Sequence, residues 1–169
     1  MNLIQGTTFG YTAWVPVARD GRDPYVRPPL YGQIFAADAI GHHPEVQVYP
    51  LPSSVENFST HAIYEAKKLA KYVLVNLDEW NSTTPYPRPK QYVQLDVPAN
   101  VTQVRVERLT ANGASADSGV QWAGMSWNYT GGRLVQAGEH KFETLRAKHG
   151  VVHLNVASTE AALVTLDSC

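Results

Sequence analysis

The chain has 169 residues, of which 14 are lysine or arginine and 15 are aspartate or glutamate, so its formal net charge is -1. This length predicts one domain, and the near-neutral charge argues against a strongly basic nucleic-acid binder. No apolar run approaches the roughly 18 residues that a membrane-spanning helix needs, so we expect no membrane partner. The single cysteine, Cys169, excludes a disulfide within the chain and a zinc site built on paired cysteines. We expect neither a metal nor a cofactor.

The first 27 residues carry aromatic side chains between glycines and prolines, a composition typical of a loop. A long irregular segment at the start of a compact domain indicates either a function or a missing neighbour.

One helix is predicted, from Pro28 to Gly41. Two prolines suit its first turn, where a missing N–H costs nothing, and glycine suits its end. Gln33 and Asp38 are expected to point away from the apolar face. That face consists of residues near i, i+4 spacing: Leu30, Tyr31, Ile34, Phe35 and Ile40. It has little to pack on if the rest of the chain is all β.

The remaining residues predict an antiparallel β-sandwich of about seven to nine strands, punctuated by Gly-, Asn- and Pro-rich turns. The apolar run 72–75 suits a central strand buried on both faces, and Gly131-Gly132 predicts a hairpin turn. The predicted strands are Glu45–Leu51, Ala62–Ala66, Lys71–Asp78, Gln91–Val97, Thr102–Thr110, Val120–Trp127, Lys141–Ala147, Val151–Ala157 and Ala161–Leu166.

No complete catalytic constellation is apparent in the sequence. A glycosidase needs two carboxylates roughly 5–9 Å apart across a cleft. Asp78 and Glu79 are the best local candidates, but neighbours on a strand point to opposite faces. The adjacent His42 and His43 are more simply explained as cations after a helix C-terminus than as metal ligands.

The tryptophans are the candidates for sugar contact, because an aromatic ring can stack on the apolar face of a sugar. Tryptophan in a strand is more often part of a core, so Trp122 and Trp127 are assigned to packing. Trp80 lies in a turn, and for this residue both interpretations stay open.

Four Asn-x-Ser/Thr sequons begin at Asn57, Asn81, Asn100 and Asn128. They are more than the composition predicts by chance, which indicates a secreted protein with these asparagines in surface loops. The first residues, however, lack the basic and apolar regions of a signal peptide. We therefore expect either a cytosolic protein or the tail of a longer secreted one.

Several stretches are informative in combination. The N-terminal ones are Gln5-Gly6, Tyr11-Thr12-Ala13-Trp14-Val15-Pro16, Val26-Arg27-Pro28-Pro29-Leu30-Tyr31-Gly32 and Ala39-Ile40-Gly41. The later ones are residues 75–83 with Arg88-Pro89, then 106–111 and 121–127. In order and spacing the chain resembles the last barrel strand, the last helix and the C-terminal β-sandwich of family 79 glycoside hydrolases, the fungal and bacterial β-glucuronidases related to heparanase.

The resemblance implies that residues 1–43 are a remnant of a (β/α)8 barrel and that 44–169 are the β-sandwich domain. The family hydrolyses β-linked glucuronides with retention, using two glutamates on earlier barrel strands that lie outside this chain. We therefore expect a non-catalytic fragment of a secreted glycoprotein, whose partner is the barrel of the parent enzyme. The alternative is a free-standing module that binds uronic-acid-containing glycans.

The resemblance also suggests where sugar contacts would lie. The loop after the last barrel strand is at the catalytic face in barrels generally. Tyr11 is therefore expected to line a sugar subsite, with Trp14 nearby, unless both only pack the sandwich against the barrel. Without the barrel, the face with Leu30, Ile34 and Phe35 is expected to be exposed and to promote association. Whether Cys169 pairs with an upstream cysteine stays open.

Overall fold

The computed structural model describes residues 14–15, 18 and 21–168, and the fold is given for those residues. They form one helix, α1 (Pro28–Ile40), and thirteen strands. The strands are β1 (Trp14–Val15), β2 (Tyr25–Val26), β3 (Val46–Leu51), β4 (Phe58–Glu65), β5 (Lys68–Asn76), β6 (Lys90–Asp96), β7 (Val101–Thr110), β8 (Gln121–Trp122), β9 (Ser126–Thr130), β10 (Arg133–Ala137), β11 (Glu143–Arg146), β12 (Val151–Ala157) and β13 (Glu160–Ser168).

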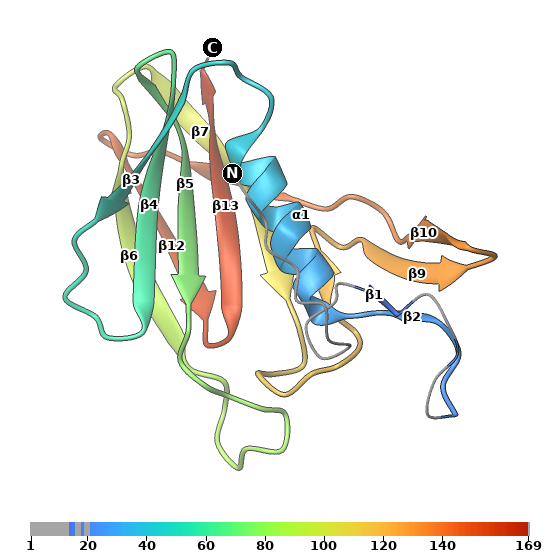
Figure 1. Cartoon of the computed structure of the whole chain (residues 1–169). Coiled ribbons are helices and arrows are strands. Elements are labelled where there is room, and N and C mark those ends of the chain that lie inside the picture. Colours follow the sequence, from blue (N-terminus) through green and yellow to red (C-terminus); the bar gives the residue numbers. More distant parts are fainter. Residues whose placement is uncertain (1–13, 16–17, 19–20, 169) are drawn as a thin grey trace.

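Two antiparallel sheets of unequal size face each other (Figure 1). The larger has seven strands in the order β11-β7-β13-β5-β4-β3, with β8 paired to the end of β7. The smaller consists of β6 and β12. Two further hairpins, β1–β2 and β9–β10, lie outside these sheets. The predicted antiparallel sandwich is confirmed.

The sandwich core lies between the two sheets. Strand β13 contributes Ala162, Val164 and Leu166 to it, while the alternate residues Ala161 and Leu163 face the other side of the sheet. Both sets are buried, because successive side chains of a strand point to opposite faces. The neighbouring strand β5 likewise has apolar residues on both faces, as predicted for the run 72–75.

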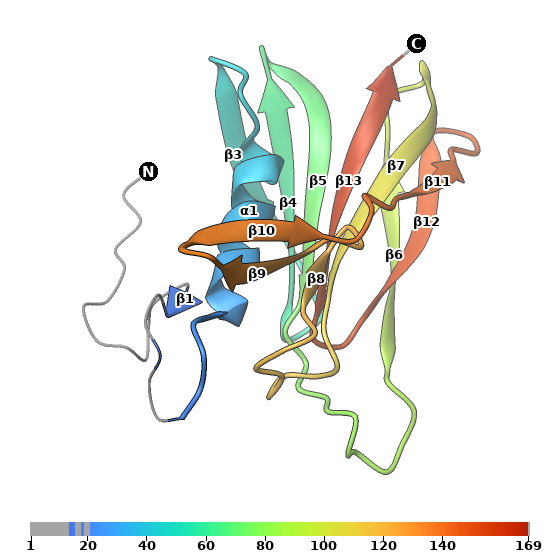
Figure 2. The same ribbon diagram turned by 90° about the vertical axis from the view of Figure 1, so that its right-hand side faces the viewer.

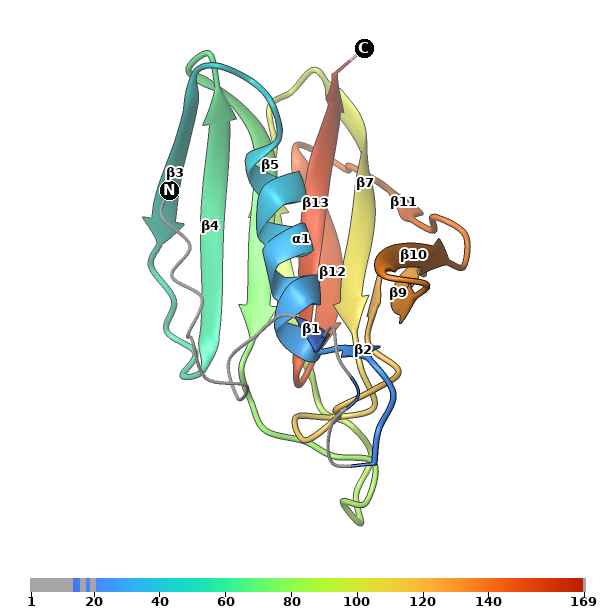
Figure 3. The ribbon, with the colours of Figure 1, turned by 45° about the vertical axis from the view of Figure 1, so that its right-hand side comes forward.

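Helix α1 packs on the outer face of the seven-stranded sheet, so the expectation of an exposed helix is wrong. In Figure 3 it lies in front of β5 and β13, with β12 behind them. Leu30 and Phe35 are buried in a second core, and Ile34 is partly buried there. The Phe35 ring meets the Trp122 ring edge-on, with 5.1 Å between centroids. The helix finds a partner because the sheet is apolar on its outer face too.

The ends of α1 are fixed by the residues that the sequence suggested. Pro28 and Pro29 occupy its first positions, and Gly41 ends it with a φ of 65°. The Lys71 ammonium, on β5, donates to the carbonyls of Asp38 and Ala39 at 3.3 and 3.2 Å. These carbonyls belong to the helix end, where no helical partner is present and a cation is favourable.

Residues 120–127 do not form the single predicted strand. The chain reverses at Ala123 and Gly124, whose φ angles are 47° and 77°, and this separates β8 from β9. A Cβ on Gly124 would lie 2.7 Å from the Glu139 carbonyl oxygen. The apolar sequence hides this turn because alanine in a left-handed conformation gives no sequence signal. Strand β10 was not predicted, although Gly131-Gly132 does form the predicted turn before it.

The packing of α1 yields the first prediction. Phe35→Ala should lower the free energy of unfolding by about 3–5 kcal/mol, because it leaves a cavity against Trp122. Ala37 is exposed on the same helix, and Ala37→Ser should change the stability by roughly 0.5 kcal/mol or less. Urea unfolding of both variants measures the difference. Equal stabilities would contradict a helix that is part of the domain core.

The second prediction concerns Tyr72, whose hydroxyl donates to the Asp96 carbonyl at 2.6 Å. Burial raises the pKa of Tyr72, and the nearby Tyr64 and Asp96 add to the effect. The unfolded chain therefore releases this proton at lower pH than the folded chain. The free energy of unfolding should fall as pH rises above about 10, the ordinary tyrosine pKa. This component should be absent from Tyr72→Phe, so parallel pH curves for the two proteins would contradict it.

Candidate functional site

A groove of about 960 Å³ opens beside helix α1. One wall is the segment of residues 22–31 around β2 and the start of the helix, and the other is the β9–β10 hairpin with residues 117–121. Figure 2 shows the hairpin on the same side of the large sheet as α1. The lining of the groove combines aromatic rings with polar groups, as in typical small-molecule sites.

The floor of the groove is held by Tyr31 and Trp127. Their rings meet edge-on with 5.5 Å between centroids, and the Trp127 backbone N–H donates to the Tyr31 hydroxyl at 3.1 Å. Tyr31 is buried and belongs to the helix core. Thus the helix that packs on the sheet also positions the β9–β10 hairpin. Trp127, which the sequence assigned to packing, makes this contact.

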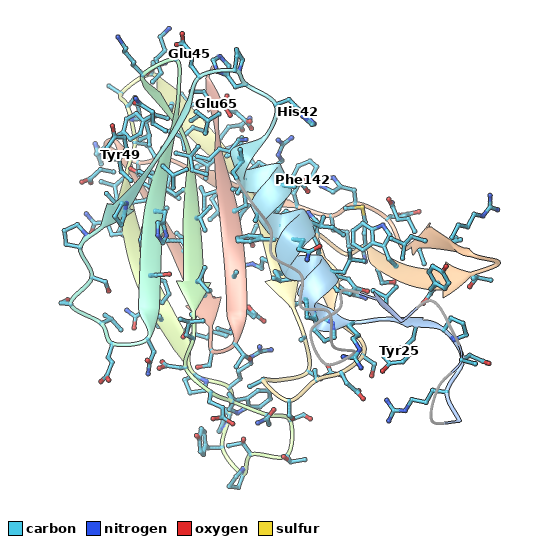
Figure 4. All side chains as sticks on the ribbon, in the orientation of Figure 1. Tyr25, His42, Glu45, Tyr49, Glu65 and Phe142 are labelled. Carbon is cyan, nitrogen blue, oxygen red and sulfur yellow. The ribbon has the colours of Figure 1, made fainter. Side chains whose placement is uncertain are left out.

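The wall formed by residues 22–31 carries Tyr25, which is labelled in Figure 4. The Arg27 guanidinium donates to the Tyr25 hydroxyl at 3.0 Å and also lies over its ring, 5.5 Å from the centroid. Nearby, Arg22 and Asp117 form an exposed ion pair at 3.5 Å that joins the two walls. Tyr25 and Tyr129 were not among the residues predicted to contact a sugar. For Tyr129 the signal is its i, i+2 spacing from Trp127 on a strand.

The sugar-contact residues predicted from the sequence are not brought together in the described part of the chain. Tyr11 lies outside the described residues. The backbone of Trp14 pairs with Val26 in the β1–β2 hairpin, next to the groove, but its side chain lies outside the description. Trp80 does not line the groove. It lies in the connection between β5 and β6.

Trp80 is used for packing in that connection. Its indole N–H donates to the Tyr86 carbonyl at 3.2 Å, and the Arg88 guanidinium lies 5.1 Å from the centre of its ring. Arg88 in turn donates to the carbonyls of Ser158 and Ala111. The half-buried ring is therefore shared with a cation, which leaves less of it for a sugar.

A buried carboxylate, Glu107, is paired with a histidine. Glu107 is 7% exposed and accepts a hydrogen bond from Nε2 of His140 at 2.5 Å. This contact ties the segment after β10 to β7, which is a structural role. No group of three or more His, Cys, Asp and Glu residues in the described ranges is placed to hold a metal ion. Within those ranges no helix is long and apolar enough to cross a membrane.

The four sequons differ in their surroundings. Asn57, Asn100 and Asn128 are all exposed. Asn57 and Asn100 lie outside the groove lining, whereas Asn128 is part of it, so a glycan on Asn128 would extend into the groove. Asn81 is half-buried, and its side-chain oxygen accepts from the backbone N–H and the hydroxyl of Ser115, both at 2.8 Å. Asn81 therefore has a structural use in addition to its sequon.

Comparison with known proteins places these features in a family. The model of the glycosyl hydrolase family 79 C-terminal beta domain matches residues 60–163. A beta-glucuronidase of Aspergillus niger is 25% identical over 98% of this chain and 33% of its own length. One of Neurospora crassa is 29% identical over 80% of this chain and 30% of its own length. The chain thus spans about a third of the length of the curated relatives it matches.

A solved structure is similar in fold as well. The 4-O-α-L-rhamnosyl-β-D-glucuronidase of Fusarium oxysporum, in complex with Rha-GlcA, superposes with a TM-score of 0.71. It is 26% identical, and the match covers 82% of this chain and 29% of that chain.

Asn81 provides the prediction for this region. Asn81→Ala should lower the free energy of unfolding by about 0.5–1.5 kcal/mol, because the Ser115 N–H and hydroxyl lose their protein acceptor and exchange it for water. Asn100→Ala removes an equivalent sequon at an exposed site and should change stability by roughly 0.5 kcal/mol or less. Both variants are compared by urea unfolding of protein made without glycosylation. A harmless Asn81→Ala would contradict the structural role.

Proposed function

Because the chain belongs to glycosyl hydrolase family 79 and carries its C-terminal beta domain, we propose that it is a non-catalytic part of a longer β-glucuronidase-type enzyme. Its role is to support the catalytic domain and to help shape the sugar cleft. The exposed sequons favour a secreted parent protein. The activity of the whole enzyme resides in the two thirds of the relatives that this chain does not match.

One observation carries this proposal: α1 packs into the second core, on the outer face of the seven-stranded sheet. The sequence resemblance assigns this helix to the catalytic barrel, yet Leu30, Tyr31 and Phe35 are buried against the large sheet. An element common to both domains would fix one domain to the other with little freedom. The support is then mechanical, because moving the helix would open the second core.

The groove side of the molecule is the surface proposed to face the catalytic domain. The groove adjoins the segment that leads into α1, and the β9–β10 hairpin beside it exposes Leu134 and Val135 by 38% and 40%. Leu134 pairs with Tyr129 and shares its face of the hairpin, whereas Val135 points to the other face. An exposed leucine next to the aromatic lining of the groove is suited to contact with a partner. The part of the relatives that this chain does not match, about two thirds of their length, is large enough to form such a partner domain.

A free-standing glycan-binding module remains the alternative function. The aromatic residue first considered for it, Trp80, has its ring beside Arg88 and its N–H bonded to a carbonyl. Trp80 therefore does not favour a glycan-binding role, and such a role would need another surface.

A chimera tests the proposed function. The chain replaces the matching C-terminal third of the Aspergillus niger beta-glucuronidase, and release of nitrophenol from an aryl β-glucuronide is followed. We expect the chimera to be active and the 169-residue chain alone to be inactive. Leu134→Asp should shorten the half-life of the chimera at elevated temperature several-fold, with KM unchanged, because it places a charge in the domain contact.

Leu77→Asp is the matched control, since Leu77 is 65% exposed and lies outside the groove lining. It should leave the half-life unchanged. Equal half-lives for the two variants would contradict the assigned surface. Turnover by the chain alone that a substitution within it abolishes would contradict the non-catalytic role.

A further inference from the structure

The outer face of the β6–β12 sheet carries an unusual set of side chains. Tyr92 is 76% exposed, more than any other large apolar or aromatic side chain in the described part of the chain. Its cross-strand neighbour is Asn155, and Gln94 is paired with His153 in the same register. All four line one shallow depression of about 330 Å³. This volume is at the low end of small-molecule sites, roughly 300–1,000 Å³.

The sheet holds these groups in place because its other face belongs to the sandwich core. Leu95 and Leu154 alternate with the outward residues and are 4% and 6% exposed. Seven consecutive residue pairs join the two strands, from Val151↔Asp96 to Ala157↔Lys90. Groups on such a sheet are better preorganised for binding than groups on a loop.

The chemistry of the depression fits a sugar ring. A tyrosine ring offers an apolar surface to the C–H groups of a pyranose, and its hydroxyl remains available for a hydrogen bond. The amides of Gln94 and Asn155 each offer donors and an acceptor, which matches sugar hydroxyls that both donate and accept. Lys90 and Asp96 lie at opposite ends of β6 and have opposite charges. The residues that line the depression include no lysine, arginine, aspartate or glutamate. An anionic ligand would find no lysine or arginine partner there, so the centre favours an uncharged ring.

The location keeps this face free when a catalytic domain is present. Helix α1 and the groove lie on the outer side of the seven-stranded sheet, and β6–β12 covers its opposite face (Figures 2 and 3). A domain seated at the groove would leave Tyr92 accessible.

We infer that the outer face of β6–β12 is an accessory site for a neutral pyranose unit of a polysaccharide, centred on Tyr92. The choice of glycan as the ligand class rests on the proposed function, whereas the choice of surface does not. The site would hold the polymer at the side of the enzyme remote from the groove and raise its local concentration.

Saturation-transfer NMR on the full 169-residue chain tests the site. The probes are the methyl glycosides of β-D-glucose, β-D-galactose and α-L-rhamnose at millimolar concentration, with methyl β-D-glucuronide as the charged comparison. We expect transfer to the ring protons of at least one neutral probe, stronger than to the glucuronide. Tyr92→Ala should reduce the signal at least five-fold, and Tyr92→Phe should retain most of it because the ring is kept.

Tyr49→Ala is the matched control, because Tyr49 is a 50% exposed tyrosine on the far edge strand β3 and should leave the signal unchanged (Figure 4). The thermal midpoint of Tyr92→Ala should equal that of the parent chain, since so exposed a ring contributes little packing. Absence of transfer to every neutral probe, or transfer that survives Tyr92→Ala, overturns the inference. So does concentration-dependent dimerisation abolished by Tyr92→Ala, which would make the face a contact between copies. None of these outcomes changes the result expected for the chimera. The Tyr92 site can therefore be disproved while the proposed function stands, and the reverse is also true.

Discussion

Burial of the seven-stranded sheet on both faces is the constraint on which the rest of this structure depends. The alternate residues of β13 are apolar on each side, so one face needs a second sheet and the other needs a helix. The edge-on contact between Phe35 and Trp122 and the bond from the Trp122 indole N–H to the Asp38 carboxylate, 2.5 Å long, fix α1 there. Lys71 then joins the last helical carbonyls to β5.

The two candidate surfaces follow from this arrangement. On the helix side, Tyr31 serves both the second core and the groove, so the groove keeps its shape only while α1 is packed. On the opposite side, the two-stranded sheet buries one face and presents the other to solvent. A domain built in this way can hold a partner at the groove and remain open at Tyr92. The same packing that stabilises the domain thus places the two proposed surfaces on opposite sides of it.

Particular elements show how far the sequence could lead. The helix at Pro28 and most strands of the sandwich were predictable, since alternation and turn residues are local signals. The turn at Ala123 and Gly124 was missed because the partners that hold it lie elsewhere in the chain: the Ala123 N–H donates to the Arg108 carbonyl, and the Ala123 carbonyl accepts from the Lys141 N–H. For Trp80 the sequence left both packing and sugar contact open, and the structure places Arg88 over its ring and the Tyr86 carbonyl on its indole N–H.

By itself the sequence determined the class of fold, the position of the helix and the resemblance to family 79, all of which depend on local patterns and their order. The tertiary structure decided what covers the helix, which aromatic rings are used for packing, and which remain accessible. Phe35 and Tyr92 illustrate the difference: one was expected to be exposed and is 8% exposed, and the other carried no signal and is 76% exposed. Periodicity defines the faces of an element, but burial depends on what the rest of the chain places against each face.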